Sequence, residues 1–279
     1  MADMKLFLGC VIPNRLPFIE ATSRKVLDKL GVETSDAAFS CCPEPIGFQS
    51  VCKESWLAMG ARNLCLAEAE GKDIVSLCNG CAQTLKAVKH ELDHDGDKKD
   101  EINAILSKVN KEYKGTSGVK HFIQVLMENV GIDRIKGAVT NQMSKLKVAC
   151  HTGCHYSRPS EIMQYDDPLK PKFLRELVAA TGAQVVDYEG EEICCGNGAG
   201  NTSKDVGDAL ANNKLSNAKA GGANCIVVCC PACFQQLDSQ RDLPIIYLTE
   251  LIALSMGMSY DDLNMKFHQE KKNTKELLV

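Results

Sequence analysis

Apolar positions along the first half of the chain switch between short continuous runs and a helical rhythm. Lys5–Gly9 and Asp73–Leu77 are short apolar runs, which are typical of buried strands. Apolar residues at three- and four-residue spacing predict helices over Pro17–Leu30, Cys52–Glu70 and Ala82–Leu92. Glycine follows each of the first two helices, where it commonly ends a helix.

The second half of the chain repeats this alternation. Strand-like runs occupy Lys145–Ala149, Gln184–Tyr188 and Asn224–Val228, and helical rhythm covers Lys172–Thr181 and Ser203–Ala220. Strands that alternate with helices form parallel sheets, because each helix carries the chain back to the start of the next strand. The pattern therefore predicts an α/β fold with parallel strands.

Cysteines mark the same duplication. Each half carries a single cysteine, an adjacent pair and a C-x-x-C, separated by 30 and 35 residues in the first half and by 39 and 34 in the second. The two sets are Cys10, Cys41, Cys42, Cys78 and Cys81, and Cys154, Cys194, Cys195, Cys230 and Cys233.

The duplication extends beyond the cysteines. Gly118–Gly131 matches Pro244–Gly257 in length and apolar rhythm. The repeat is too long for a solenoid unit and indicates two homologous domains. We therefore predict two pseudo-symmetric Rossmann-like lobes, with residues 1–140 in the first and residues 141–279, including a C-terminal tail, in the second.

Four of the cysteines follow predicted strands. Cys10, Cys78, Cys154 and Cys230 each come at or just after the carboxyl end of a strand. Open parallel sheets bind ligands at that edge. The three cysteine groups of each lobe, far apart in sequence, are therefore expected to meet there and to hold iron–sulfur clusters.

Composition narrows the class of function. A net charge of −4 gives no reason to expect a nucleic-acid partner. The sequence has no apolar run long enough to span a membrane and no signal peptide at its start, which favours the cytoplasm. Fifteen cysteines in such a chain indicate metal or redox chemistry, because disulfide frameworks belong to secreted chains. The charged stretch Glu91–Glu101 is expected to be a solvated connector, and Lys266–Val279 a solvated or partner-docking tail.

Five thiols per set favour an iron–sulfur cluster over zinc. Structural zinc needs four ligands, whereas each set offers one more than that. Adjacent cysteines cannot easily direct both sulfurs to one ion, but they can ligate different irons of a larger cluster. Zinc at one of the two sets remains possible. The other cysteines are expected to be buried small apolar residues: Cys52, Cys65, Cys150, Cys225 and Cys229.

The glycine-rich stretch 196–201 invites comparison with a dinucleotide-binding loop. It departs from G-x-G-x-x-G at its last position, and it follows the pair Cys194-Cys195 rather than an apolar strand. A loop around a cluster, with backbone amides near the sulfurs, is the better interpretation.

At these residues the chain resembles the CCG cysteine-rich domain family. Gly196 completes the literal Cys-Cys-Gly of the second repeat, whereas Pro43 stands at the matching position of the first. A chain with two repeats and this length is similar to the B subunits of heterodisulfide reductases. The resemblance covers about Lys5 to Gly257.

That resemblance implies a cofactor, a substrate and partners. Each five-cysteine set would hold a noncubane [4Fe-4S] cluster, and the mixed disulfide of coenzyme M and coenzyme B would be reduced between the two clusters. Electrons would arrive from the family's ferredoxin-like iron–sulfur protein, its C subunit, beside a flavin-bearing A subunit. The membrane, if involved, would be contacted by a partner.

Three further residues are candidates for the reaction. Arg15 and Arg158 follow the first cysteine of each set, and arginine binds anions such as those the family's substrate carries. His155 follows Cys154 and is a candidate proton donor to a leaving thiolate. For all three, a structural role is the alternative. His151, which also flanks Cys154, is considered for the same proton donation, with support of the site as its alternative.

Two other functions remain open. The chain could serve a related complex for lactate or glycolate oxidation, thiol:fumarate reduction or sulfur oxidation, because such complexes use the same domain. It could also be a scaffold stabilised by redox-silent zinc.

Overall fold

The computed structural model describes residues 2–45 and 47–279 and contains two parallel sheets of four strands each. The first has the order β2-β1-β3-β4 and the second the order β6-β5-β7-β8. Every neighbouring pair is parallel, and the same strand order in both sheets confirms the predicted α/β duplication. The strands are β1 (Ala2–Phe7), β2 (Val32–Ser35), β3 (Asp73–Ser76), β4 (Val119–His121), β5 (Lys147–His151), β6 (Gln184–Val186), β7 (Cys225–Val228) and β8 (Ile245–Tyr247).

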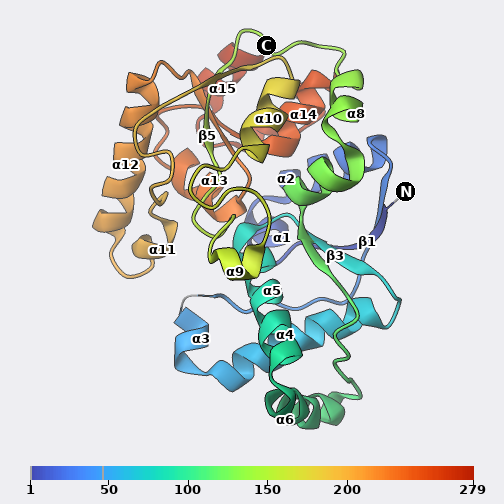
Figure 1. Ribbon diagram of the computed structural model, residues 1–279. Coiled ribbons are helices and arrows are strands. Elements are labelled where there is room, and N and C mark those ends of the chain that lie inside the picture. The colour runs from blue at the N-terminus through green and yellow to red at the C-terminus, as the bar shows by residue number, and fades with distance from the viewer. Residues whose placement is uncertain (1, 46) are drawn as a thin grey trace.

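Helices connect the strands of each sheet (Figure 1). In the first half these are α1 (Val11–Arg15), α2 (Pro17–Lys29), α3 (Gly47–Val51), α4 (Lys53–Glu68), α5 (Asn79–His94), α6 (Gly96–Leu106), α7 (Phe122–Gln124) and α8 (Ile132–Gly137). In the second half they are α9 (Ser160–Met163), α10 (Phe173–Ala180), α11 (Asn197–Gly200), α12 (Lys204–Ala220), α13 (Pro231–Asp238), α14 (Leu248–Ser255) and α15 (Lys271–Leu278). The predicted strands and long helices are therefore confirmed, apart from shifts of a few residues at their ends.

The two halves are not independent bodies. One continuous core of buried apolar residues draws on both sheets, and a second, smaller core lies within the first half. Helix α2 packs against α14, where the buried Ser23 and Thr249 hydroxyls lie 3.0 Å apart. The halves therefore present the carboxyl ends of their sheets to each other in a fixed arrangement.

The stretch predicted to be a solvated connector is helical. It forms the end of α5 and the start of α6, with the Asp95 side chain accepting a hydrogen bond from the Lys98 backbone amide. Buried Ile102 and Leu106 hold α6 against the first half. The charged residues lie on the exposed side of an amphipathic helix. In the sequence, such a run of charged residues looks the same as a solvated loop.

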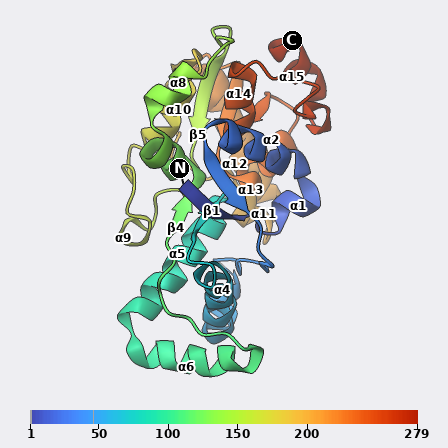
Figure 2. The same ribbon diagram turned by 90° about the vertical axis from the view of Figure 1, so that its right-hand side faces the viewer.

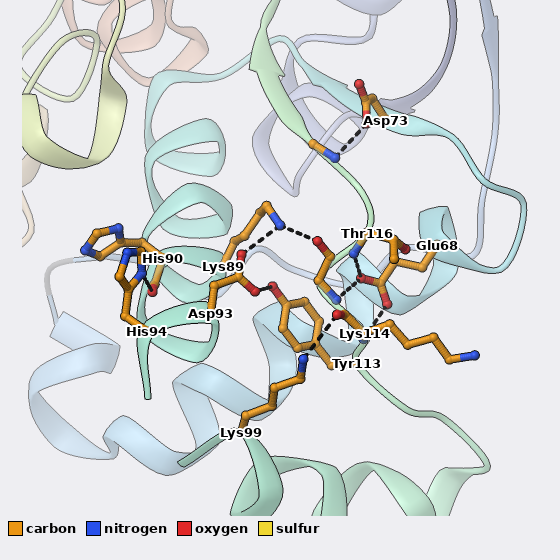
Figure 3. A network of polar contacts seen from close by, with 12 residues as sticks. Glu68, Asp73, Lys89, His90, Asp93, His94, Lys99, Tyr113, Lys114 and Thr116 are labelled. Carbon is orange, nitrogen blue, oxygen red and sulfur yellow. Dashed lines mark hydrogen bonds and ion pairs between the residues drawn. The ribbon is translucent and has the colours of Figure 1, made fainter. Parts of the chain in front are cut away.

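The segment that returns from α6 to β4 is held by side chains of the first half (Figure 3). The Glu68 carboxylate accepts hydrogen bonds from three successive backbone amides, those of residues 114–116, at 2.6–3.0 Å. The Tyr113 hydroxyl donates to Asp93, and Asp73 accepts from the Gly118 amide. These contacts hold α6 and the segment that follows it in a projection that extends away from the second half (Figure 2).

The C-terminal segment is anchored by a buried ion pair. His268 Nε2 lies 2.8 Å from Glu250 Oε1, and neither side chain is accessible to solvent. Glu250 also accepts a hydrogen bond from the Tyr247 amide at the start of α14. Thr274 of α15 is buried as well, so the prediction of a solvated tail is wrong for these residues.

This ion pair should make stability depend on pH. Burial lowers the pKa of His268, but the Glu250 carboxylate opposes it and the net effect is a raised pKa. The contribution of the ion pair to folding stability is therefore complete below the pKa of an unfolded histidine, about 6.5, and is lost as pH rises through the higher pKa of His268 in the folded protein. We expect His268→Gln to lower the free energy of unfolding by roughly 3 kcal/mol near pH 6, with a smaller difference at higher pH. Anaerobic urea unfolding across pH 6 to 9 measures this, and a difference independent of pH would contradict it.

Candidate metal centre

A cavity of about 670 Å³ lies between the two halves. All ten cysteines of the two sets line it, together with residues that follow β1, β3, β5 and β7. The carboxyl ends of both sheets thus meet at one site, as parallel-sheet geometry predicts for a ligand site. Polar side chains from both halves complete its wall, among them Asn14, Arg15, Asn79, His155 and Gln235.

The ten thiols form one continuous series of contacts, which we call the thiol chain. Within each half the single cysteine contacts the adjacent pair, and the pair contacts the C-x-x-C. Cys78 and Cys230 join the halves. The order is Cys10, Cys41, Cys42, Cys81, Cys78, Cys230, Cys233, Cys195, Cys194 and Cys154. Outward from the contact between Cys78 and Cys230, each half passes from its C-x-x-C to its adjacent pair and then to its single cysteine.

Each C-x-x-C is placed by the turn from a strand into a helix. Cys78 and Cys230 are the residues before the first helical turn of α5 and α13, and Cys81 and Cys233 lie in that first turn. Backbone amides are free at a helix N-terminus, and the helix dipole there favours negative charge. Both features suit thiolate sulfur.

Glycine allows the backbone to approach these sulfurs. Gly9 and Gly153 precede the first cysteine of each set and have φ values of +66° and +85°. A Cβ atom on Gly9 would lie 2.7 Å from Cys81 Sγ, and one on Gly153 would lie 3.1 Å from Cys233 Sγ. A side chain at Gly9 would displace the Cys81 sulfur, and one at Gly153 would displace the Asn79 amide, 2.8 Å from the added Cβ, and crowd the Cys233 sulfur.

Three members of the thiol chain are favoured as thiolates. The pKa values of Cys42, Cys194 and Cys230 are lowered, because the sulfur of each accepts hydrogen bonds from two neighbouring thiols. The Gly196 amide also donates to Cys194 Sγ at 3.4 Å. Further deprotonation would bring like charges together in a largely buried space, and metal cations offset that repulsion.

The donor set fits iron–sulfur clusters. All fifteen cysteines lie in the described part of the chain and are free thiols. Ten sulfurs in one contiguous series exceed the four ligands of a tetrahedral zinc ion. They divide into two equivalent groups of five, related by the duplication. The chemistry of these cysteine groups indicates iron–sulfur binding.

Direct contacts between the two halves beside the cavity hold the two groups in register. Asn79 Nδ2 donates to the Thr152 carbonyl at 2.5 Å, and Cys229 Sγ lies 3.2 Å from the same carbonyl. The Tyr247 hydroxyl donates to the carbonyls of Leu77 and Cys229, which precede the two C-x-x-C turns. One phenol thus ties together the strand ends that carry Cys78 and Cys230.

The structure brings two of the three other candidate residues to the cavity. Arg15 ends α1 and lines the wall, and His155 Nδ1 lies 3.5 Å from Cys154 Sγ. Arg158 does not reach it: its guanidinium donates to the Glu192 carbonyl, and it lines a separate pocket with Lys170.

Sequence reasoning missed two residues of the site and was incomplete for a third. Asn79 lies inside the first C-x-x-C, so its position alone could have indicated a contact with the site. Tyr247 carries no such signal, because it ends β8, outside both cysteine sets of the sequence. His151, considered for proton donation or for support of the site, is fully buried beside Cys195 and Cys233, and burial lowers the pKa of its imidazole to about 3.

The remaining cysteines follow the prediction except for one. Cys65, Cys150, Cys225 and Cys229 are buried. Cys52 is partly exposed at the start of α4, where its thiol lies 3.1 Å from the Ser55 hydroxyl. The glycine-rich stretch after Cys195 forms the short helix α11 rather than an open loop, and Asn197, Gly198 and Asn201 line the cavity.

Comparison with known proteins identifies the repeated unit. The model of the CCG cysteine-rich domain family matches residues 4–86 and 148–238. The B subunit of a ferredoxin/F(420)H(2)-dependent CoB-CoM heterodisulfide reductase from Methanosarcina acetivorans is 38% identical over 95% of this chain and 93% of its own. An 8-methylmenaquinol:fumarate reductase membrane anchor subunit of Wolinella succinogenes is 30% identical over 94% of this chain and 95% of its own.

A solved structure shares the fold. A hypothetical protein from Helicobacter pylori superposes on 96% of this chain with a TM-score of 0.74 and 14% identity, and this chain spans 52% of its length. Within residues 2–45 and 47–279, no helix is long and apolar enough to cross a membrane. The duplicated cysteine motif, the fold and the relatives agree: the chain belongs to the CCG cysteine-rich family, as a two-repeat oxidoreductase subunit of the heterodisulfide reductase B type.

Proposed function

We propose that this chain is the disulfide-reducing subunit of a heterodisulfide reductase that acts on the mixed disulfide of coenzyme M and coenzyme B. The observation that carries the proposal is the thiol chain, whose two equivalent groups of five sulfurs meet in one cavity. Relatives that are 38% and 36% identical are named as the B subunits of CoB-CoM heterodisulfide reductases.

Two noncubane [4Fe-4S] clusters are the proposed cofactors, one on each five-cysteine group. When bound, they supply one electron each and iron that binds thiolate sulfur. Reduction of a disulfide consumes two electrons and two protons and yields two thiols. Two centres on opposite sides of one cavity match that requirement.

The chain's own residues bind the substrate and supply protons. The Arg15 guanidinium lines the cavity and offers a fork of donors to an anionic arm of the substrate. His155 lies beside Cys154, with Nδ1 3.5 Å from its Sγ, and is the proposed proton donor to a leaving thiolate. Arg158 lies in another pocket, which gives no support to a role for it in this reaction.

The proposal extends to the assembly. Relatives named as B subunits imply a multi-subunit complex. We assign electron delivery to a ferredoxin-like iron–sulfur protein, the C subunit, next to a flavin-bearing A subunit, and we place the complex in the cytoplasm. We also retain the division into lobes of residues 1–140 and 141–279.

One observation favours a second candidate. The relative named as the membrane anchor of 8-methylmenaquinol:fumarate reductase covers nearly the whole chain at 30% identity. The same paired centres would then transfer electrons in a complex with a different substrate.

The test begins with anaerobic purification together with the partner proteins of the complex. Iron, acid-labile sulfide and zinc are then quantified per chain, and reduction of the coenzyme M–coenzyme B disulfide is assayed with a reduced viologen dye. We expect about eight irons per chain, a paramagnetic signal after oxidation with coenzyme M thiol, and turnover. Full iron without the thiol-dependent signal or turnover would favour the second candidate, and zinc alone would overturn both.

A further inference from the structure

His151 occupies an unusual place beside the second group of cysteines. It is the last residue of β5 and is 1% exposed. One of its ring nitrogens and the sulfurs of Cys195 and Cys233 all lie within 4.8 Å of one another. Among the described residues, this is the one group of three histidine, cysteine or acidic side chains close enough to share a metal ion.

The hydrogen bond of the other ring nitrogen defines the tautomer. His151 Nδ1 lies 3.5 Å from the Glu191 carbonyl oxygen, which can only accept. Nδ1 therefore carries the proton, and Nε2 presents a lone pair, because burial disfavours the doubly protonated ring. Metal-binding histidines in proteins are commonly oriented by this kind of hydrogen bond from the second ring nitrogen to a carbonyl.

A lysine holds that carbonyl in position. Lys214 is 1% exposed and donates to the Gly190 carbonyl at 2.8 Å and to the Glu191 carbonyl at 3.2 Å. The orientation of the His151 ring is thus fixed from α12, through the backbone that leads to Cys194 and Cys195. The imidazole is preorganised with Nε2 as its free nitrogen.

Nε2 has no hydrogen-bond partner although it is completely buried. A buried acceptor without a partner costs about 1 to 3 kcal/mol, so a water, an ion or another ligand is expected to meet such an atom. The sulfurs of Cys195 and Cys233 are the ones grouped with a ring nitrogen of His151, and Nε2 is the ring nitrogen that no hydrogen bond engages. A metal ion held by these two sulfurs would give Nε2 the partner that it lacks.

The first half supplies the contrast. Phe7 ends β1 three residues before Cys10, as His151 ends β5 three residues before Cys154. Phe7 is paired with Ser76 and His151 with Val228, each two residues before its C-x-x-C, so the two positions are equivalent in register. Phe7 is buried in one cluster with Cys42 and Cys81, the counterparts of Cys195 and Cys233.

We infer that His151 is a nitrogen ligand to iron of the second-half centre, through Nε2, and that the first-half centre has no such ligand because Phe7 stands in its place. The inference rests on the proposed iron–sulfur centres. A neutral imidazole ligand raises the reduction potential of an iron–sulfur centre relative to thiolate ligation alone. The two centres of the duplicated chain are then electronically unequal, with the second half the better electron acceptor.

The direct test uses the wild-type complex with histidine labelled with ¹⁵N, in a paramagnetic state produced by reduction or by thiol treatment. Pulsed electron paramagnetic resonance should show a strongly coupled nitrogen that changes from the ¹⁴N to the ¹⁵N pattern. No substitution is needed for this measurement. Absence of a strongly coupled histidine nitrogen from a chain with full iron and sulfide would overturn the inference while leaving the proposed function intact.

Two variants identify the residue. His151→Phe installs the residue of the first half, and we expect it to abolish the nitrogen coupling and to lower the midpoint potential of one centre only. His155→Phe removes the other histidine near Cys154 and should leave the coupling unchanged. Persistence of the coupling in His151→Phe, or its loss in His155→Phe, would overturn the assignment. Lack of iron and sulfide in the wild-type chain would instead refute the proposed centres.

Discussion

Replacing Cys195 with serine is expected to remove about half of the iron from the chain. Cys195 contacts both Cys194 and Cys233 in the thiol chain, so its loss breaks the five-sulfur group of the second half. The first-half group does not contact Cys195 and should keep its centre. Serine retains the size of cysteine but replaces the thiolate that iron–sulfur clusters require.

A matched control lies in the same half. Cys225 belongs to β7 and is completely buried, but it does not line the cavity. Cys225→Ala should cost about 1 kcal/mol of stability and leave the iron content unchanged. Iron and acid-labile sulfide per chain are measured after anaerobic purification of each variant. Loss of all iron in Cys195→Ser would show that the ten thiols hold a single joint centre.

The duplication made much of the fold predictable. Short apolar runs before Cys10, Cys78, Cys154 and Cys230 located four parallel strands, and the position of each cysteine at a strand end indicated where the site lies. The reason is physical: parallel strands end at one edge, so residues that follow different strands meet. No knowledge of side-chain packing was needed for that step.

Other elements gave weaker signals. β2 has the sequence Val-Glu-Thr-Ser and is too short and polar for a clear period, although it pairs with β1 along four residues. α6 is charged along much of its length and is stabilised by a few buried side chains, chiefly Ile102 and Leu106. In both cases tertiary contacts, rather than local pattern, decide the structure.

The arrangement between the halves could not be predicted from either repeat alone. The contact between Cys78 and Cys230 depends on how the two sheets face each other, which follows from the shared core and from Tyr247. The role of His151 did have a signal in the sequence. Alignment of the two repeats pairs His151 with Phe7. A polar residue at a position where the other repeat has an apolar residue is a candidate for function.

Substituting Gly153 with alanine is expected to remove the second-half centre, and Gly9→Ala the first. Each glycine has a positive φ, which costs alanine about 1 to 2 kcal/mol. The added methyl group of Gly153→Ala would also lie 2.8 Å from Asn79 Nδ2 and 3.1 Å from Cys233 Sγ, and that of Gly9→Ala 2.7 Å from Cys81 Sγ. Because the backbone there leads directly into the first cysteine of each set, the ligands must separate, and iron per chain should fall by about half.

The chain offers controls that separate strain from contact. Gly71 and Gly222 have φ values of +64° and +85°, close to those of Gly9 and Gly153, but an added Cβ meets nothing within 4 Å. Alanine at either control should lower the free energy of unfolding by the same 1 to 2 kcal/mol, roughly, and leave iron content unchanged. If all four variants lost iron equally, backbone strain alone would explain the loss. If Gly9→Ala and Gly153→Ala kept their iron, the close approach of backbone to sulfur would not limit assembly of the centres.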